Sequence, residues 1–122
     1  MTTFGKEFYD RQLAFLDKKE TDALVDSQYT EDAELLSHDF QIRGREALKK
    51  HFAGYLDHLG YIKLISTDKF TELDDAIFFE ATVEVKAGLE KGATVRVYDI
   101  FEFSNGKARR HYTGLLSFTP NT

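Results

Sequence analysis

Apolar and polar residues repeat with two different periods along this chain, a helical period in the first half and a strand period in the second. In residues 4–18 and 45–59, apolar side chains recur every three or four positions, and this spacing predicts two amphipathic helices. A shorter helix is expected between them, with Thr21 or Asp22 as its N-cap, and Gly60 is expected to end the third helix as a C-cap. The predicted apolar stripe of that third helix comprises Leu48, Phe52, Tyr55 and Leu59.

The second half of the chain alternates apolar and polar residues, which is typical of half-buried antiparallel strands. This alternation is clear in residues 76–87 and weaker in residues 61–70, and one or two short strands are expected within 34–42. Asn105-Gly106 is a type I′ turn signal, and it predicts a hairpin over residues 96–112. Helices followed by strands with hairpin-length connections predict an α+β fold, in which the helices pack on one face of an antiparallel sheet.

One carboxylate lies among the apolar residues of the predicted hairpin. Asp99 shares a strand face with Val95, Val97, Phe101 and Phe103. A carboxylate on such a face must be hydrogen-bonded, neutralised or exposed to a cavity, because burying it unpaired is costly. Burial would favour the protonated form, which can donate a hydrogen bond to a developing oxyanion. The alternative interpretation is structural, with Asp99 accepting hydrogen bonds that fix the packing.

The partner of Asp99 depends on the register of the hairpin. A two-residue turn at Asn105-Gly106 places Tyr112 opposite Asp99 on the inner face. In that register His111 points outward, together with Tyr98, Ile100, Thr113 and Leu115. This outer face is too apolar for a solvated surface and predicts a homodimer through the sheet. A longer, bulged turn would shift the pairing by one residue and replace Tyr112 with His111.

Composition narrows the class of protein. With 122 residues, of which 42% are hydrophobic, the chain is expected to form a single domain over residues 1–122. The net charge of −5 and the lack of a basic patch argue against binding to nucleic acid or to anionic membranes. The chain has no cysteine, which excludes disulfides and thiolate chemistry. No apolar run approaches the roughly 20 residues of a membrane span, and the N-terminus lacks signal-peptide features, so a cytoplasmic protein is expected.

Three strings in the sequence carry a resemblance to a known family. They are FYDRQLAFLDKKETDALVDSQYTEDAEL, QIRGREALKKHF and VRVYDIFEFSNGKARRHYTGLLSF, which together span nearly the whole chain. In order and spacing they resemble the SnoaL-like and ketosteroid-isomerase-like branch of the NTF2-like superfamily. The resemblance implies a cone of the cystatin or NTF2-like type, with about three helices and a curved sheet enclosing an apolar pocket. It also implies dimers through the open sheet face. Members of this branch include steroid isomerases, polyketide cyclases, epoxide hydrolases and proteins that only bind a ligand.

The resemblance carries over to individual positions only in part. Asp99 falls where the steroid isomerases have the carboxylic acid that donates to the substrate oxyanion. Their tyrosine donor falls at Gln12, with Tyr9 one turn earlier, and their general base falls at Ser37, next to His38. Only one of the three isomerase residues matches, so steroid isomerisation is not expected.

The candidate pocket combines these positions with residues from the periodicity. Gln12 interrupts an apolar helix stripe and therefore either is capped by a neighbour or faces a cavity. A histidine side chain can act as a base near neutral pH, so His38 is the candidate base or proton shuttle beside Asp99, although a loop histidine is often only solvated. His51 and His58 are interpreted as helix-surface residues. The predicted catalytic residues are Asp99 and His38, and the predicted ligand-binding residues are Gln12, Tyr9, Ser37, Tyr55 and Tyr112.

Three functions remain open at this level. The first is a pocket protein that binds a small apolar ligand through a carbonyl or hydroxyl group. The second is a cofactor-independent isomerase, cyclase or hydrolase that uses Asp99 and His38 as acid and base. The third is a non-catalytic dimerising scaffold. No cluster of histidines and carboxylates with metal-ligand spacing is present in the sequence, so neither a metal nor a cofactor is expected.

Overall fold

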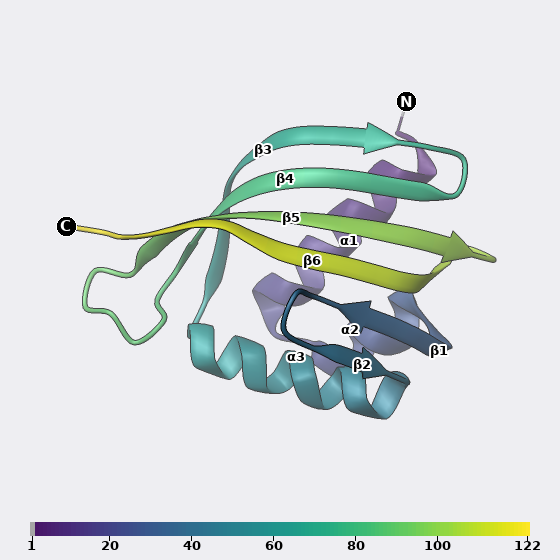
Figure 1. The fold of residues 1–122 in the computed structure, drawn as a ribbon, viewed down its shortest axis with the longest axis horizontal. Helices are drawn as coiled ribbons and strands as arrows, with labels where there is room; N and C mark the ends of the chain where they lie inside the picture. Colours follow the sequence, from purple (N-terminus) through teal and green to yellow (C-terminus); the bar gives the residue numbers. More distant parts are fainter. Residues whose placement is uncertain (1) are drawn as a thin grey trace.

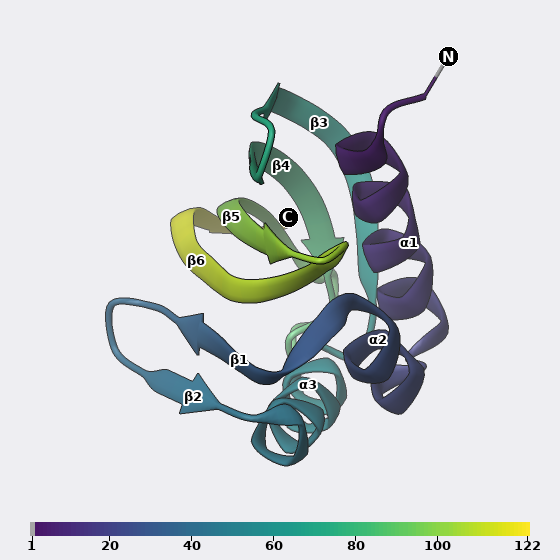
Figure 2. The ribbon, with the colours of Figure 1, turned by 90° about the vertical axis from the view of Figure 1, so that its right-hand side faces the viewer.

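A curved six-stranded sheet carries three helices on one of its faces in the computed structural model, which describes residues 2–122 (Figure 1, Figure 2). The strand order is β2-β1-β6-β5-β4-β3, and neighbouring strands are antiparallel except for the parallel pair β1 and β6. The predicted α+β class is confirmed. The elements are α1 Phe4–Lys18, α2 Thr21–Gln28, β1 Tyr29–Leu36, β2 Gln41–Arg43, α3 Arg45–Leu59, β3 Ile62–Glu72, β4 Ala76–Val85, β5 Ala93–Ser104 and β6 Lys107–Pro120.

Helix boundaries agree closely with the predicted ones. α1 and α3 have the predicted bounds, and Gly60 is the C-cap of α3. The predicted N-cap of α2 is wrong, because the helix begins at Thr21 and its N-cap, Glu20, makes no side-chain capping bond. In the sheet, the strand predicted for 76–87 ends at Val85, because Ala87 and Gly88 have positive φ angles of 50° and 71° and turn the chain.

The start of α1 is fastened to the end of β3 by one carboxylate. Glu72 accepts hydrogen bonds from the Thr3 hydroxyl at 2.5 Å and from the Gly5 amide at 2.9 Å. A Cβ at Gly5 would lie 2.6 Å from both Glu72 and Ile77, so glycine allows the helix to approach the sheet this closely. The next turn is held by a 2.5 Å hydrogen bond between the hydroxyls of Tyr9 and Thr67.

Helix α3 packs with a stripe that differs by one position from the predicted one. Leu56 is buried in place of Tyr55, and Tyr55 is 40% exposed. At the start of α3, the Arg45 side chain donates from Nε and Nη2 to the carbonyl oxygen of Tyr29, at 3.1 and 2.7 Å. This contact fixes the junction of α2 and β1, where Tyr29 is fully buried.

The register of the β5–β6 hairpin departs from both predicted registers. The Asn105-Gly106 turn has the expected positive φ angles, 53° and 81°, and Ser104 pairs with Lys107. A β-bulge then adds one residue to β6, so that Asp99 lies opposite Thr113 and not opposite Tyr112 or His111. A one-residue shift exchanges the two faces of a strand.

This shift corrects the predicted faces of β6. His111 pairs with Phe101 and faces the helices, whereas Tyr112 pairs with Ile100 on the opposite face. Thr113 and Leu115, which were expected on the outer face, line the inner one.

Two glycines give a direct test of this packing. Gly114 lies opposite Tyr98, and a Cβ at Gly114 would overlap the Tyr98 ring, so Gly114→Ala is expected to lower the free energy of unfolding by about 1–3 kcal/mol. Gly54 lies in the middle of α3, and a Cβ there would meet no other atom within 4 Å, so Gly54→Ala is expected to raise it by about 0.4–1 kcal/mol. Urea denaturation measures both changes. Equal effects of the two substitutions would contradict the hairpin register.

Candidate functional site

A cavity of about 330 Å³ lies between the inner face of the sheet and the helices α1 and α3. Its sheet wall is mostly apolar, and its polar side chains come from α1, α3, β5, β6 and the segment that follows β1. The apolar residues that the strands β4 and β5 contribute are Phe79, Ala81, Val83, Val85, Val95, Val97 and Phe101. Asp99 lies in this wall, so the carboxylate that interrupts the apolar face borders a cavity.

Asp99 is paired with a histidine from the neighbouring strand. The Nε2 atom of His111 lies 2.6 Å from Oδ1 of Asp99, and the two side chains are only 6% and 14% exposed. The imidazole stacks on Phe101, with ring centroids 3.9 Å apart. Because a buried carboxylate needs a strong hydrogen-bond donor, this contact explains how Asp99 is tolerated on the apolar face.

The second nitrogen of His111 contacts a buried tyrosine. The Tyr29 hydroxyl lies 2.8 Å from Nδ1 of His111, and it also accepts a hydrogen bond from Nε2 of Gln12 at 3.0 Å. Burial raises the pKa of Tyr29 far above its usual value, so this hydroxyl stays protonated and remains a donor. The pair of Asp99 and His111 is therefore connected through Tyr29 to helix α1.

Gln28 extends this connection at the end of α2. Its Nε2 donates to Oε1 of Gln12 at 3.3 Å and to the carbonyl oxygen of Phe8 at 3.0 Å. Its Oε1 accepts from Nε of Arg11 at 3.1 Å. Gln12 is thus capped on both sides by protein groups and also lines the cavity, so both interpretations of its place in the apolar helix stripe apply.

The other predicted site residues are distributed unevenly around the cavity. Tyr9 lines it, but its hydroxyl is bonded to Thr67. Ser37 and His38 both line the rim, and the His38 side chain is 81% exposed. Tyr55 also lines the cavity; although 40% of the residue is exposed, desolvation by the surrounding protein, together with the charge of Asp99, raises the pKa of its phenol to about 12. Tyr112 lies on the other face of the sheet, where its hydroxyl donates to Glu102 at 3.1 Å.

Three residues at this site were missed from the sequence. His51, expected on the helix surface, lines the cavity, and burial together with nearby His111 lowers its pKa. His111 is on the outer face in the two-residue-turn register, and only the alternative bulged turn places it beside Asp99; the bulge in the structure lies after the Phe103–Ala108 pair and turns His111 inward. For Tyr29, the sequence offers one sign of a buried polar group: the residue directly follows a predicted helix whose last turn contains the polar Gln28.

Neither a metal-binding cluster nor a membrane-spanning helix occurs in the part of the chain that the structure describes. Within residues 2–122, no group of three histidine or carboxylate side chains is arranged to hold a metal ion. None of the helices in that range is long and apolar enough to cross a membrane.

Comparisons with known proteins agree with this architecture. A search of curated proteins finds no match. Among solved structures, an NTF2-like protein from Anabaena variabilis superposes with a TM-score of 0.85 at 19% identity, covering 100% of this chain and 98% of that one. The epoxide hydrolase/cyclase-like enzyme SalBIII, described with a role in pyran ring formation in the polyether salinomycin, gives 0.80 at 14%, covering 95% of both chains. An LEH-like epoxide hydrolase from M. tuberculosis gives 0.75 at 17%, covering 93% of this chain and 84% of that one.

These identities are low, so the structural likenesses establish the fold alone. The family is established by sequence, because the model of the SnoaL-like domain matches residues 7–111, which is most of the chain. The protein therefore belongs to the SnoaL-like domain family.

Proposed function

We propose that the protein binds a small, mostly apolar carbonyl compound in the cavity and that Asp99 moves a proton on it without a cofactor. The observation that carries this proposal is the buried Asp99–His111 hydrogen bond at the border of an otherwise apolar cavity. A carboxylate that is oriented by a histidine and open to a cavity on its other side has the arrangement of a general base.

The donor and acceptor roles in this chain of hydrogen bonds can be assigned in order, beginning with a backbone carbonyl. The Phe8 oxygen can only accept, so the Gln28 atom that faces it must be Nε2, and Arg11 donates to Oε1 on the other side. Since Gln28 also presents Nε2 to Gln12, the Gln12 atom facing it must be Oε1. This assigns both amides from the hydrogen-bond network.

The same reasoning fixes the proton on His111. Gln12 presents Nε2 to Tyr29, so the Tyr29 oxygen accepts this bond and its own proton goes to Nδ1 of His111. The neutral imidazole then carries its proton on Nε2 and donates it to Oδ1 of Asp99. Every donor in the chain of hydrogen bonds points toward Asp99, which favours the ionised carboxylate.

In the proposed reaction, the second carboxylate oxygen, Oδ2, takes a proton from the carbon next to the ligand carbonyl. The electrons of the broken C–H bond form the C=C bond of an enolate, and the carbonyl oxygen becomes negative. With a saturated ketone, the protonated Asp99 returns the proton to the same carbon and the C=O bond re-forms, which is observed only as hydrogen exchange. With a β,γ-unsaturated ketone, it returns the proton to the γ-carbon, the double bond moves next to the re-formed C=O bond, and the result is an isomerisation. Tyr55 and Ser37 line the same cavity and supply neutral hydroxyl donors for the oxyanion.

In this proposal, His111 rather than His38 orients Asp99. His38 lies at the exposed rim, where its Nδ1 is 3.9 Å from Asp39. Two of the structural neighbours are described as an epoxide hydrolase/cyclase-like enzyme and as an epoxide hydrolase. Opening an epoxide also requires proton transfer, which supports this class of chemistry. Ligand binding without turnover is the second candidate, and it is favoured by the apolar character of the cavity wall.

We further propose that the protein forms a homodimer through the outer face of the sheet. The helices cover the inner face only (Figure 2), and the outer face carries adjacent apolar side chains on three strands. Phe78 and Tyr98 stack there at 6.5 Å, next to Ile100 and Tyr112. These four residues replace the predicted patch, from which His111, Thr113 and Leu115 are removed by the bulge. An apolar patch of this kind usually marks an interface.

Asp99→Asn tests the base directly. The asparagine oxygen can still accept from Nε2 of His111, so the variant is expected to fold, but its amide cannot take a proton. The rate of solvent deuterium exchange into a panel of aliphatic and cyclic ketones and enones, followed by NMR, is expected to fall on the order of 10²–10⁴-fold. His38→Ala is the matched control and is expected to keep most of the rate, because His38 is exposed at the rim. Equal exchange by wild type and Asp99→Asn would remove Asp99 from the mechanism, and binding without exchange would favour the second candidate.

Tyr29→Phe tests the orientation of His111. The change removes the donor to Nδ1 and leaves Gln12 and His111 without their buried partner. The free energy of unfolding is expected to fall by about 1–3 kcal/mol, and the deuterium-exchange rate is expected to fall as well. Tyr61→Phe is the control, because its hydroxyl bonds to Glu84 outside the cavity. An unchanged exchange rate in a folded Tyr29→Phe variant would contradict the positioning role.

Ile100→Glu tests the dimer. A charge in the middle of the outer patch is expected to give a monomer of 14.0 kDa by light scattering at micromolar concentration, whereas the wild type is expected to give twice that mass. Leu73→Glu places the same charge on an exposed leucine outside the patch and is expected to leave the dimer intact. A monomeric wild type would overturn the proposed interface.

A further inference from the structure

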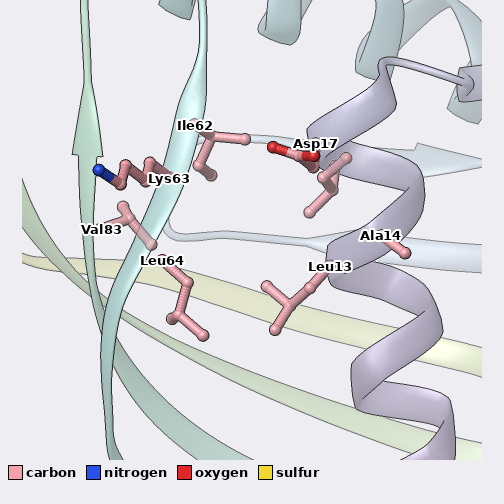
Figure 3. Close-up of a pocket in the computed structure, with 8 residues that line it drawn as sticks. Leu13, Ala14, Asp17, Ile62, Lys63, Leu64 and Val83 are labelled. Carbon is pink, nitrogen blue, oxygen red and sulfur yellow. The ribbon is translucent and has the colours of Figure 1, made fainter.

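A second hollow, of about 260 Å³, opens between the later turns of α1 and the first residues of β3 (Figure 3). Leu13 from α1 and Leu64 from β3 project into it from opposite walls. We call this hollow the α1–β3 groove. It shares Leu13, Leu16, Ile62 and Val83 with the cavity that contains Asp99. The groove is therefore a continuation of that cavity toward the surface.

The groove exists because α1 is fastened to β3 at one end only. Within residues 2–122, three hydrogen bonds join the α1 region to β3, and all of them lie in the N-terminal half of the helix region. They run from Thr3 and Gly5 to Glu72 and between Tyr9 and Thr67. Among the described residues, no hydrogen bond joins the second half of α1 to β3, and the helix leaves the strand there.

Leu64 shows that the space is unfilled. It pairs with Val83, whose side chain is buried on the inner face, so Leu64 points toward the helices. It is nevertheless 38% exposed. An inward-facing leucine with this exposure lacks the partner that would normally cover it, and an apolar chain would bury it.

The path from Asp99 to the groove is apolar. Val97 and Val95 are the next inward residues on β5, and Val83 is the residue opposite Val95. The four steps along the strand from Asp99 to Val95 span roughly 13 Å. A ligand with its carbonyl at Asp99 must therefore be elongated to reach the groove.

Of the two charged residues that line the groove, only Asp17 has its charge on the helix side, because Lys63 alternates with the inward-facing Ile62 and Leu64 and its ammonium points away from the groove (Figure 3). The carboxylate of Asp17 disfavours an anionic ligand end, and the remaining side chains that face the groove are apolar. The chemistry of the groove thus fits a neutral aliphatic chain.

We propose that the α1–β3 groove holds the aliphatic tail of an elongated carbonyl compound whose polar end lies at Asp99. This inference rests on the proposed function and adds the substrate class. Each buried methylene contributes about 0.8 kcal/mol, or about fourfold in affinity, so chain length should control binding strongly once the tail enters the groove.

The experiment compares the binding of 2-pentanone and 2-decanone to the full chain by ligand-observed NMR titration. Wild type is expected to bind 2-decanone at least about tenfold more tightly, since several methylenes are buried. Leu64→Trp fills the groove and is expected to remove most of this difference, with the affinity for 2-pentanone unchanged. Ile65→Trp, on the adjacent exposed residue that does not line the groove, is the matched control and is expected to behave as wild type.

A second variant guards against a folding defect in Leu64→Trp. Asp17→Trp closes the mouth from an exposed position in the last turn of α1, where an acidic residue is unfavourable for the helix dipole. If both ketones bind and both tryptophan variants keep the wild-type preference for 2-decanone, the groove assignment is overturned. If neither ketone binds to wild type, the proposed function itself fails and the groove assignment fails with it. Asp99→Asn changes the polar end of the cavity only, so it is expected to change the affinities for the two ketones by the same factor and to leave the preference for 2-decanone as in wild type.

Discussion

The rest of this structure depends on how one buried carboxylate is hydrogen-bonded. Asp99 lies on the apolar inner face of the sheet, and its Oδ1 is satisfied by His111 at 2.6 Å. Each buried polar side chain that bonds to this pair also needs a hydrogen-bond partner. This need accounts for Tyr29, Gln12 and Gln28 in positions that apolar residues would otherwise occupy. Within residues 2–122, no buried side-chain nitrogen or oxygen lacks a partner. A complete network of this kind both stabilises the fold and holds the carboxylate in one orientation at the cavity.

A single β-bulge decides which residues belong to this network. The extra residue in β6 turns His111 inward and Tyr112 outward, and it changes the partner of Asp99 to Thr113. The same bulge therefore sets both the inner site and the composition of the outer apolar face. Bulges next to functional residues commonly re-aim a side chain in this way. The SnoaL-like fold supplies the cavity, and the bulge supplies the histidine that makes Asp99 a candidate base.

The fold was predictable from the sequence because its signals are local. The 3.6-residue period and Gly60 define α3, and the alternation from Ala76 defines β4. Asp99 was also predictable, since a carboxylate among valines and phenylalanines is visible in the pattern. The partners of Asp99 were predictable only in part, because His111 is its neighbour only in the alternative bulged register and Tyr29 and Gln12 reach the pair through long-range geometry. The bulge near Arg109 has no strong sequence signal. A polar residue such as Gln28 or His51 gives the same sequence pattern whether it lies on a solvated helix face or in a buried hydrogen-bond network.

We propose that the hydrogen-bond chain holds His111 as a neutral imidazole whose Nε2 proton is donated to the carboxylate of Asp99. The most direct measurement is ¹⁵N NMR of the histidine side chains in labelled protein, with the His111 signals assigned by comparison with His111→Asn. At neutral pH, we expect a protonated Nε2 and an unprotonated Nδ1 that accepts from Tyr29. A proton on Nδ1, or an imidazolium protonated on both nitrogens, would contradict this assignment.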